Sequence, residues 1–143
     1  MRLLCFLAKR FHWQSFSKTL EQVGNAPLPD VDVDDGLANC VVVFAHAEAA
    51  DEPEEARKRV FKHTLKHVKW LANKRDLRHV VLHSFTHLGA TSSTPEFART
   101  FLDDLAQRLT DTGYVVKTTP FGYFCEWSLD VFGESLAKVY KQI

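Results

Sequence analysis

The stretch Cys40-Val41-Val42-Val43-Phe44-Ala45 is an unbroken apolar run that is rich in β-branched and aromatic residues. A strand covered on both faces has this pattern, because neither set of its alternating side chains meets water. His79–Ser84 (H-V-V-L-H-S) has a similar composition. Between the two runs, residues 53–72 show the spacing of an amphipathic helix. The order strand, helix, strand predicts an α/β fold.

Two helices are indicated by their caps and their apolar spacing. The first is expected to begin near Pro53, a residue tolerated in a first turn, beside acidic residues that favour a helix N-terminus. Its apolar arc consists of Val60, Phe61, Thr64, Leu65, Val68, Leu71 and Ala72. Ser93 or Thr94 is expected to cap the second, with Pro95 at its start and Gly113 at its end.

The other elements complete a single mixed β-sheet. We expect strands at Leu3–Ala8, Phe11–Trp13, Tyr114–Thr119 and Tyr123–Val131, a loop over Gly24–Ala38, and a short closing helix over Ser135–Gln142. Pro120-Phe121-Gly122 is read as a tight corner between the last two strands. The alternation of strands and helices predicts one mixed sheet with packed helices, as a single domain over residues 1–143.

The composition is that of a globular protein, with 45% hydrophobic and 25% charged residues. No stretch approaches the ~20 apolar residues of a membrane span, and Leu3–Ala8 is too short for a signal peptide. The three cysteines, Cys5, Cys40 and Cys125, have no CxxC spacing. We therefore expect a cytoplasmic protein that does not contact membranes.

Charge is distributed unevenly although the formal net charge is zero. Residues 21–55 contain ten acidic and no basic side chains, whereas residues 57–78 contain nine basic side chains and one acid. Such asymmetry indicates a polyanion-binding face, and a solvated helix face is the alternative. The Cys40–Phe44 run and Trp70, which lies off the helix arc, together suggest more apolar surface than one small domain buries, and hence a homodimer.

Common catalytic machinery is not recognisable in the chain. The pairs His63/His67 and His79/His83 lack the third ligand that a zinc site needs, so no metal and no cofactor are expected. There is no GxSxG elbow and no phosphate-binding glycine loop. Strand alternation places Cys125 toward the core. His87 differs, because it follows the end of a strand, where α/β proteins commonly bind ligands; a structural histidine is the alternative.

Several motifs, taken in order, resemble the N-terminal editing domain of archaeal-type threonyl-tRNA synthetase. They are the apolar strand Val80–Leu82, then His87-Leu88, then Ser92–Glu96 at a helix start, then Gly113–Val116, and finally Pro120–Tyr123. The beginning of the chain and its central apolar strand are similar as well. The resemblance implies the fold of D-aminoacyl-tRNA deacylases, a homodimer, and removal of serine wrongly attached to threonine tRNA. It implies a substrate-assisted reaction, in which a ribose hydroxyl helps to activate water.

The resemblance implies one catalytic side chain, His87, and a substrate pocket formed by Phe85, Thr86, Pro120, Phe121, Gly122, Tyr123, Phe124 and Cys125. Lys62, Lys66 and Lys69 are the expected contacts to tRNA, whose aminoacylated 3′ end is the expected partner. The family has Tyr-Lys where this chain has Phe124-Cys125. This chain has Leu7-Ala8-Lys9 where the family has His-Ser-Asp, and it has Lys138 where the family has a functional glutamate.

These departures leave two functional hypotheses. The first is a free-standing deacylase that acts in trans on mischarged tRNA of the Ser-tRNA(Thr) type. The second is a non-catalytic module on the same fold that binds tRNA or a protein. Losing a lysine and a tyrosine hydroxyl removes hydrogen-bond donors, each of which is typically worth ~10²–10³ in rate.

Overall fold

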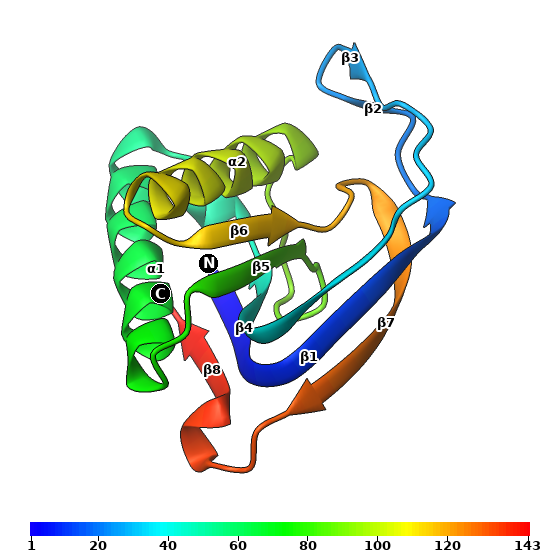
Figure 1. The fold of residues 1–143 in the computed structure, drawn as a ribbon. Coiled ribbons are helices and arrows are strands. Elements are labelled where there is room, and N and C mark those ends of the chain that lie inside the picture. The colour runs from blue at the N-terminus through cyan, green and yellow to red at the C-terminus, as the bar shows by residue number, and fades with distance from the viewer.

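The computed structural model describes residues 1–143 (Figure 1). The strands are β1 (Arg2–Lys18), β2 (Gln22–Val23), β3 (Ala26–Pro27), β4 (Asp34–His46), β5 (His79–Ser84), β6 (Val115–Thr118), β7 (Tyr123–Val131) and β8 (Lys138–Gln142). The helices are α1 (Glu54–Lys74) and α2 (Pro95–Asp111), with short 3-10 turns at Ala49–Asp51 and Ser135–Ala137. The predicted mixed sheet with packed helices is confirmed.

The main sheet has the strand order β6-β5-β4-β1-β7, and β8 also pairs with β1. Strands β4, β5 and β6 are parallel, whereas β1 is antiparallel to β4, β7 and β8. The first part of β1 pairs with β8 and the second part with β7, on the same side. The carboxyl ends of β4, β5 and β6 therefore lie at one edge of the sheet, where ligands of α/β proteins commonly bind.

One face of the sheet is covered by the two helices. Side chains from β1, β4 and β5 pack there with α1 and α2 in a cluster of 21 buried residues. As expected, Val60, Val68 and Leu71 of α1 are fully buried. Thr94 caps α2 by accepting a hydrogen bond from the Phe97 N–H at 3.3 Å.

The other face carries a smaller cluster that contains strand residues only: Ala8, Phe11, Trp13, Cys40, Val42, Phe44 and Val81. Trp127 on β7 lies 5.4 Å from Phe44 on β4, between ring centroids, although β1 separates the two strands. The sheet must therefore curl strongly. The pairing of β1 with β7 has a register irregularity at Ala8/Arg10, and Asn39 on β4 is left-handed with a φ of 50°. Irregularities of this kind bend strands and increase their twist.

The Cys40–Phe44 run is covered on both faces, as predicted, and every residue in it is buried. It is covered within one chain, so the expectation that it leaves surplus apolar surface is wrong. Trp70 does lie off the core, with 44% of its surface exposed.

Three predicted elements need correction. Ser135–Gln142 was expected to be a helix, but only Ser135–Ala137 forms a 3-10 turn, and β8 then pairs with Arg2–Phe6. The expected strands at Leu3–Ala8 and Phe11–Trp13 are parts of one strand, β1. The expected loop Gly24–Ala38 contains β3 and the beginning of β4.

Candidate functional site

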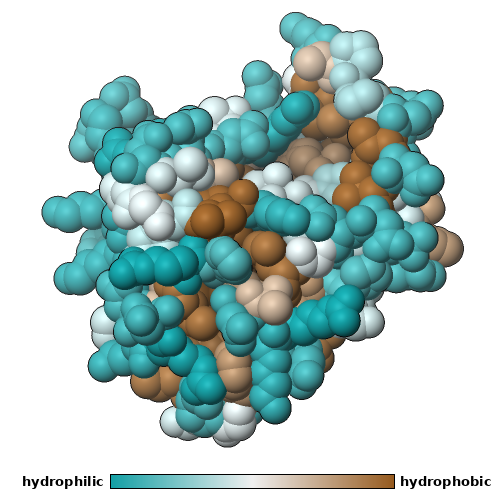
Figure 2. Space-filling model, viewed as in Figure 1, coloured by the Kyte–Doolittle hydropathy of each residue, from teal (hydrophilic) through white to brown (hydrophobic).

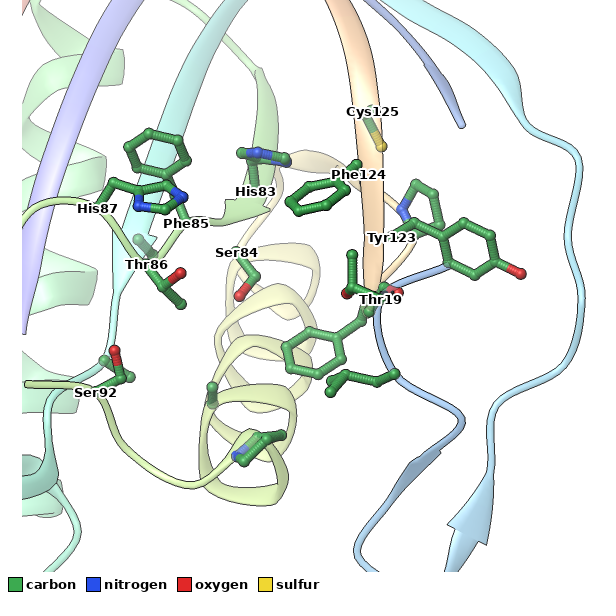
Figure 3. A pocket seen from close by; sticks show the side chains of 18 of the residues that line it. Thr19, His83, Ser84, Phe85, Thr86, His87, Ser92, Tyr123, Phe124 and Cys125 are labelled. Atoms are coloured by element: carbon green, nitrogen blue, oxygen red, sulfur yellow. Dashed lines mark hydrogen bonds between the residues drawn. The ribbon is translucent and has the colours of Figure 1, made fainter. Parts of the chain in front are cut away.

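A pocket of about 490 Å³ lies at the edge where the parallel strands end (Figure 3). It is bounded by the end of β5, the loop that leads to α2, the corner between β6 and β7, and the beginning of β7. Thr19 and Leu20, from the arm that carries β2 and β3, complete its rim. In the space-filling view, hydrophobic atoms line a hollow between α2 and this arm (Figure 2).

The structure brings all nine residues expected at the substrate site together around this one pocket. They are Phe85, Thr86, His87, Pro120, Phe121, Gly122, Tyr123, Phe124 and Cys125. The His87 side chain is exposed, and its ring lies 5.2 Å from that of Phe85 in an edge-on arrangement. The expected tRNA contacts Lys62, Lys66 and Lys69 are on α1 and do not line the pocket.

The loop that carries His87 is held by a buried histidine at the end of β4. His46 is 0% exposed; its Nδ1 accepts a hydrogen bond from the Leu88 N–H at 3.1 Å, and its Nε2 lies 3.0 Å from Ser92 Oγ. Because a backbone N–H can only donate, Nδ1 is the acceptor, and the neutral ring carries its proton on Nε2. This proton is donated to Ser92. His46 therefore links both halves of the loop.

The backbone ties the same loop to β4 at its two ends. The Phe85 N–H donates to the Ala45 carbonyl at 3.0 Å, and the Ser93 N–H donates to the Ala47 carbonyl at 2.9 Å. The loop that bears His87 is therefore an ordered part of the sheet edge, which suits a residue that must keep its position in a site.

The corner at Pro120–Tyr123 is fixed by the β2–β3 arm. Both the N–H and the hydroxyl of Thr19 donate to the Gly122 carbonyl, at 2.7 and 2.9 Å. The Tyr123 hydroxyl donates to the Pro29 carbonyl at 3.1 Å. Gly122 has a φ of 78°, and a Cβ there would lie 2.5 Å from Leu28 Cδ1, so this corner requires glycine.

No aspartate, glutamate, lysine or arginine lines the pocket. Its titratable side chains are His83, His87, Tyr123 and Cys125. Burial lowers the pKa of His83 from its ordinary value of 6.5 to about 4, so this ring is neutral at physiological pH. Chemistry in this pocket depends on neutral donors and acceptors and on groups that the ligand itself supplies.

Cys125 was expected to face the core, and the structure corrects this in part. The residue packs against the aromatic cluster of the sheet, but it is partly exposed and lines the pocket. Burial raises the pKa of its thiol, and no base is hydrogen-bonded to it. A thiol of raised pKa is a poor nucleophile, because the thiolate is the reactive form.

Sequence reasoning did not identify His83, His46, Trp127 or the arm residue Thr19 as parts of this site. The two histidines were detectable, because each stands at the carboxyl end of a predicted parallel strand, where ligands gather. The contribution of Thr19 depends on the path of the arm, for which the sequence gives no signal.

No group of three or more His, Cys, Asp or Glu side chains converges in the way that a metal ion requires. Neither α1 nor α2 combines the length and the hydrophobicity of a membrane-spanning helix.

The basic face of α1 is partly neutralised. Arg57 pairs with Asp104, and Arg75 with Glu134. The lysines at positions 62, 66 and 69 have no carboxylate within 4 Å. These three cations are therefore available to a polyanion.

Comparison with protein families matches residues 1–143 to the archaea-specific editing domain of threonyl-tRNA synthetase. Similar curated proteins are threonine–tRNA ligases. Those of Methanosphaerula palustris and Staphylothermus marinus are 28% and 27% identical over 144 aligned residues, which cover 100% of this chain and 22% of each ligase. The chain thus spans about a fifth of the length of these relatives.

Among solved structures, the chain is similar to the c-Myc DNA Unwinding Element Binding Protein, with a TM-score of 0.68. The match covers 100% of this chain and 99% of the other at 11% identity, so it concerns the fold alone. The expected D-aminoacyl-tRNA deacylase-like fold is confirmed by this match.

Proposed function

Because this chain belongs to the archaea-specific editing-domain family of threonyl-tRNA synthetase, we propose that it hydrolyses mischarged tRNA of the Ser-tRNA(Thr) type. Family and fold support a role in tRNA editing. We assign this role to residues 1–143 as one domain that acts on the aminoacylated 3′ end of tRNA.

The pocket is the observation that carries the proposal. All nine residues that the family resemblance implies for the substrate site line one cavity of about 490 Å³, at the carboxyl ends of the parallel strands. Its lining has no carboxylate and no charged amine that could act as a strong base or acid. Such a lining suits a substrate-assisted reaction, in which the protein mainly positions the ester and a ribose hydroxyl helps to activate water.

In this proposal His87 contacts the ester or the ribose from the rim of the pocket. A neutral imidazole can donate one hydrogen bond and accept another, which suits either contact. The anchored loop fixes its position through His46. The backbone at Pro120–Tyr123 forms the opposite wall.

The non-catalytic alternative is favoured by Phe124 and Cys125, which stand where the family has Tyr-Lys. Phe124 is 61% exposed, and Cys125 has a neutral thiol in place of an ammonium group. A module that had lost catalysis would still bind the 3′ end of tRNA. Binding without turnover therefore distinguishes this alternative from the enzyme.

We also propose that the basic face of α1 contacts tRNA and that the chain forms a homodimer. Lys62, Lys66 and Lys69 provide unpaired cations for phosphates. Large aromatic side chains are exposed on β1 and β7, namely Phe16 at 69%, Phe124 at 61% and Trp127 at 47%. Exposed apolar surface of this kind is typical of protein interfaces. Light scattering that shows only monomer at micromolar concentration would exclude the dimer.

The test of the function is deacylation of Ser-tRNA(Thr) by the purified protein, with Thr-tRNA(Thr) as the matched control and other mischarged tRNAs as a panel. We expect release of serine in excess of spontaneous hydrolysis, with the correctly charged tRNA spared. Tight tRNA binding without acceleration on any substrate would establish the binding module instead. Cys125→Lys then restores the lysine that the family has at this position. Because the position is partly exposed, the lysine can be accommodated, and the rate of deacylation should rise.

A further inference from the structure

His83 is a pocket residue that neither the sequence motifs nor the comparisons assign. It stands near the end of β5, is 7% exposed, and packs edge-on against Phe44 with 5.0 Å between ring centroids. Its ring lines the pocket, between Phe85 and His87 on one side and Phe124 on the other (Figure 3). The position is therefore buried by its neighbours but faces the ligand space.

One ring nitrogen is fixed within the protein and the other is free. Nδ1 lies 2.8 Å from the hydroxyl of buried Thr119. Nε2 has no protein partner. Three side-chain atoms are both fully buried and without a partner, namely Trp13 Nε1, Thr64 Oγ1 and His67 Nε2, and His83 Nε2 is not among them. Nε2 must therefore be open to solvent, and the pocket is the space that this ring lines.

Hydrogen-bond accounting decides which nitrogen carries the proton. The Thr119 hydroxyl has no protein partner other than His83, so within the protein its proton finds an acceptor only when it is donated to Nδ1. A buried donor without an acceptor is costly, which favours this arrangement. The neutral ring then carries its proton on Nε2 and presents an N–H to the pocket.

We propose that His83 donates a hydrogen bond from Nε2–H to the carbonyl oxygen of the aminoacyl ester, and that Thr119 positions the ring for this role. The inference rests on the proposed deacylase function. Water adds to the ester carbonyl carbon, and the carbonyl electron pair moves to the oxygen that His83 contacts. The adduct collapses with cleavage of the bond to the ribose oxygen, which leaves with a proton derived from the water. The products are the free amino acid and a ribose hydroxyl.

The chemistry of the pocket supports this role. The family places a lysine where this chain has Cys125, so no charged donor lines the pocket to stabilise the developing oxyanion. A donor held in a buried ring needs no reorganisation during the reaction, and such donors contribute strongly to catalysis. Burial keeps the pKa of His83 at about 4, so the ring remains a neutral donor throughout the physiological range.

The test compares single-turnover and steady-state deacylation by wild-type protein, His83→Phe, His83→Gln and Thr119→Val. His83→Phe keeps the aromatic packing and removes the donor, so kcat should fall by ~10²-fold while KM changes little. His83→Gln returns an N–H and should recover part of the loss. Thr119→Val frees the ring and should give an intermediate rate. His79→Phe, on the same face of β5 but outside the pocket, is the matched control.

The outcomes separate this inference from the proposed function. If wild-type protein deacylates and a folded His83→Phe keeps kcat within about threefold, the role of His83 is overturned and the function stands. An equal loss in His83→Phe and His83→Gln would also overturn it, because packing would then explain both. Should His83→Phe fail to fold, His83→Gln and Thr119→Val decide the question. Wild-type protein that deacylates no tRNA overturns the function and the inference together.

Discussion

Replacement of His46 by alanine tests how the loop that carries His87 is held. The ring is fully buried and makes two hydrogen bonds to this loop, to the Leu88 N–H and the Ser92 hydroxyl. Removing it leaves the Leu88 N–H without its acceptor, at a cost of about 1–3 kcal/mol. The lost packing of a buried ring adds to this, so we expect a total of about 2–4 kcal/mol.

Two measurements give this cost locally and globally. At ~2–4 °C per kcal/mol for a domain near this size, the melting temperature should fall by roughly 5–15 °C. Hydrogen exchange at the Leu88 amide should accelerate by about 5–150-fold, which corresponds to 1–3 kcal/mol of lost protection. The Phe85 and Ser93 amides should retain more protection, because backbone carbonyls of β4 accept their hydrogen bonds.

Two variants serve as controls for this experiment. His46→Asn keeps an acceptor close to the position of Nδ1 and should preserve most of the Leu88 protection. Ser92→Ala removes only the partner of Nε2 and should cost about 1 kcal/mol. If His46→Ala melts within a degree of the wild-type protein and the Leu88 amide exchanges at the same rate, the loop is held by other contacts and the reasoning is wrong.

Three further predictions concern charge. Reversal of Lys62, Lys66 and Lys69 to glutamate should weaken tRNA binding and flatten its salt dependence in a filter-binding titration; unchanged affinity would make the basic run a solvated face. Asp51→Ala should destabilise the fold by about 1.5–3 kcal/mol in urea unfolding, because it removes the nearer of the two carboxylates that bind the buried Met1 amino group and leaves only Glu48 at 3.2 Å. The pKa of His83 is 6.5 in the unfolded chain and about 4 in the folded protein, so the unfolded chain takes up the proton first as the pH is lowered. The free energy of unfolding should therefore decrease by at most ~3 kcal/mol between pH 6.5 and pH 4. His83→Phe should remove this pH dependence.

The sequence predicted the parts of the fold that depend on local pattern. The apolar run at Cys40–Phe44, the start of α1 near Pro53 and the capped start of α2 are short-range signals. All three were predicted, with Thr94 as one of the two caps expected for α2. The end of the chain was not, because Leu136, Val139 and Tyr140 also have helical spacing. The first part of β1 has a free edge beside these residues, and pairing with that edge decides in favour of a strand.

The candidate site could be predicted where motifs mark it and not where tertiary contacts create it. His87 and the Pro120–Tyr123 corner came from motifs, and they line one pocket. The role of His46 depends on its contacts with Leu88 and Ser92, which are separated from it by 42 and 46 positions in the sequence. No local pattern encodes such contacts. The free nitrogen of His83 likewise depends on Thr119, 36 residues away.

The most direct test of the central claim is the rate of serine release from Ser-tRNA(Thr) with wild-type protein and with His87→Ala. We predict clear acceleration by the wild-type protein and a loss of ~1–3 kcal/mol of transition-state stabilisation in His87→Ala, which is about 5–150-fold in turnover. Cys125→Ala should change the rate much less, because its thiol has a raised pKa and no activating base. Loss of activity in Cys125→Ala with full activity in His87→Ala would contradict the account and require a cysteine nucleophile.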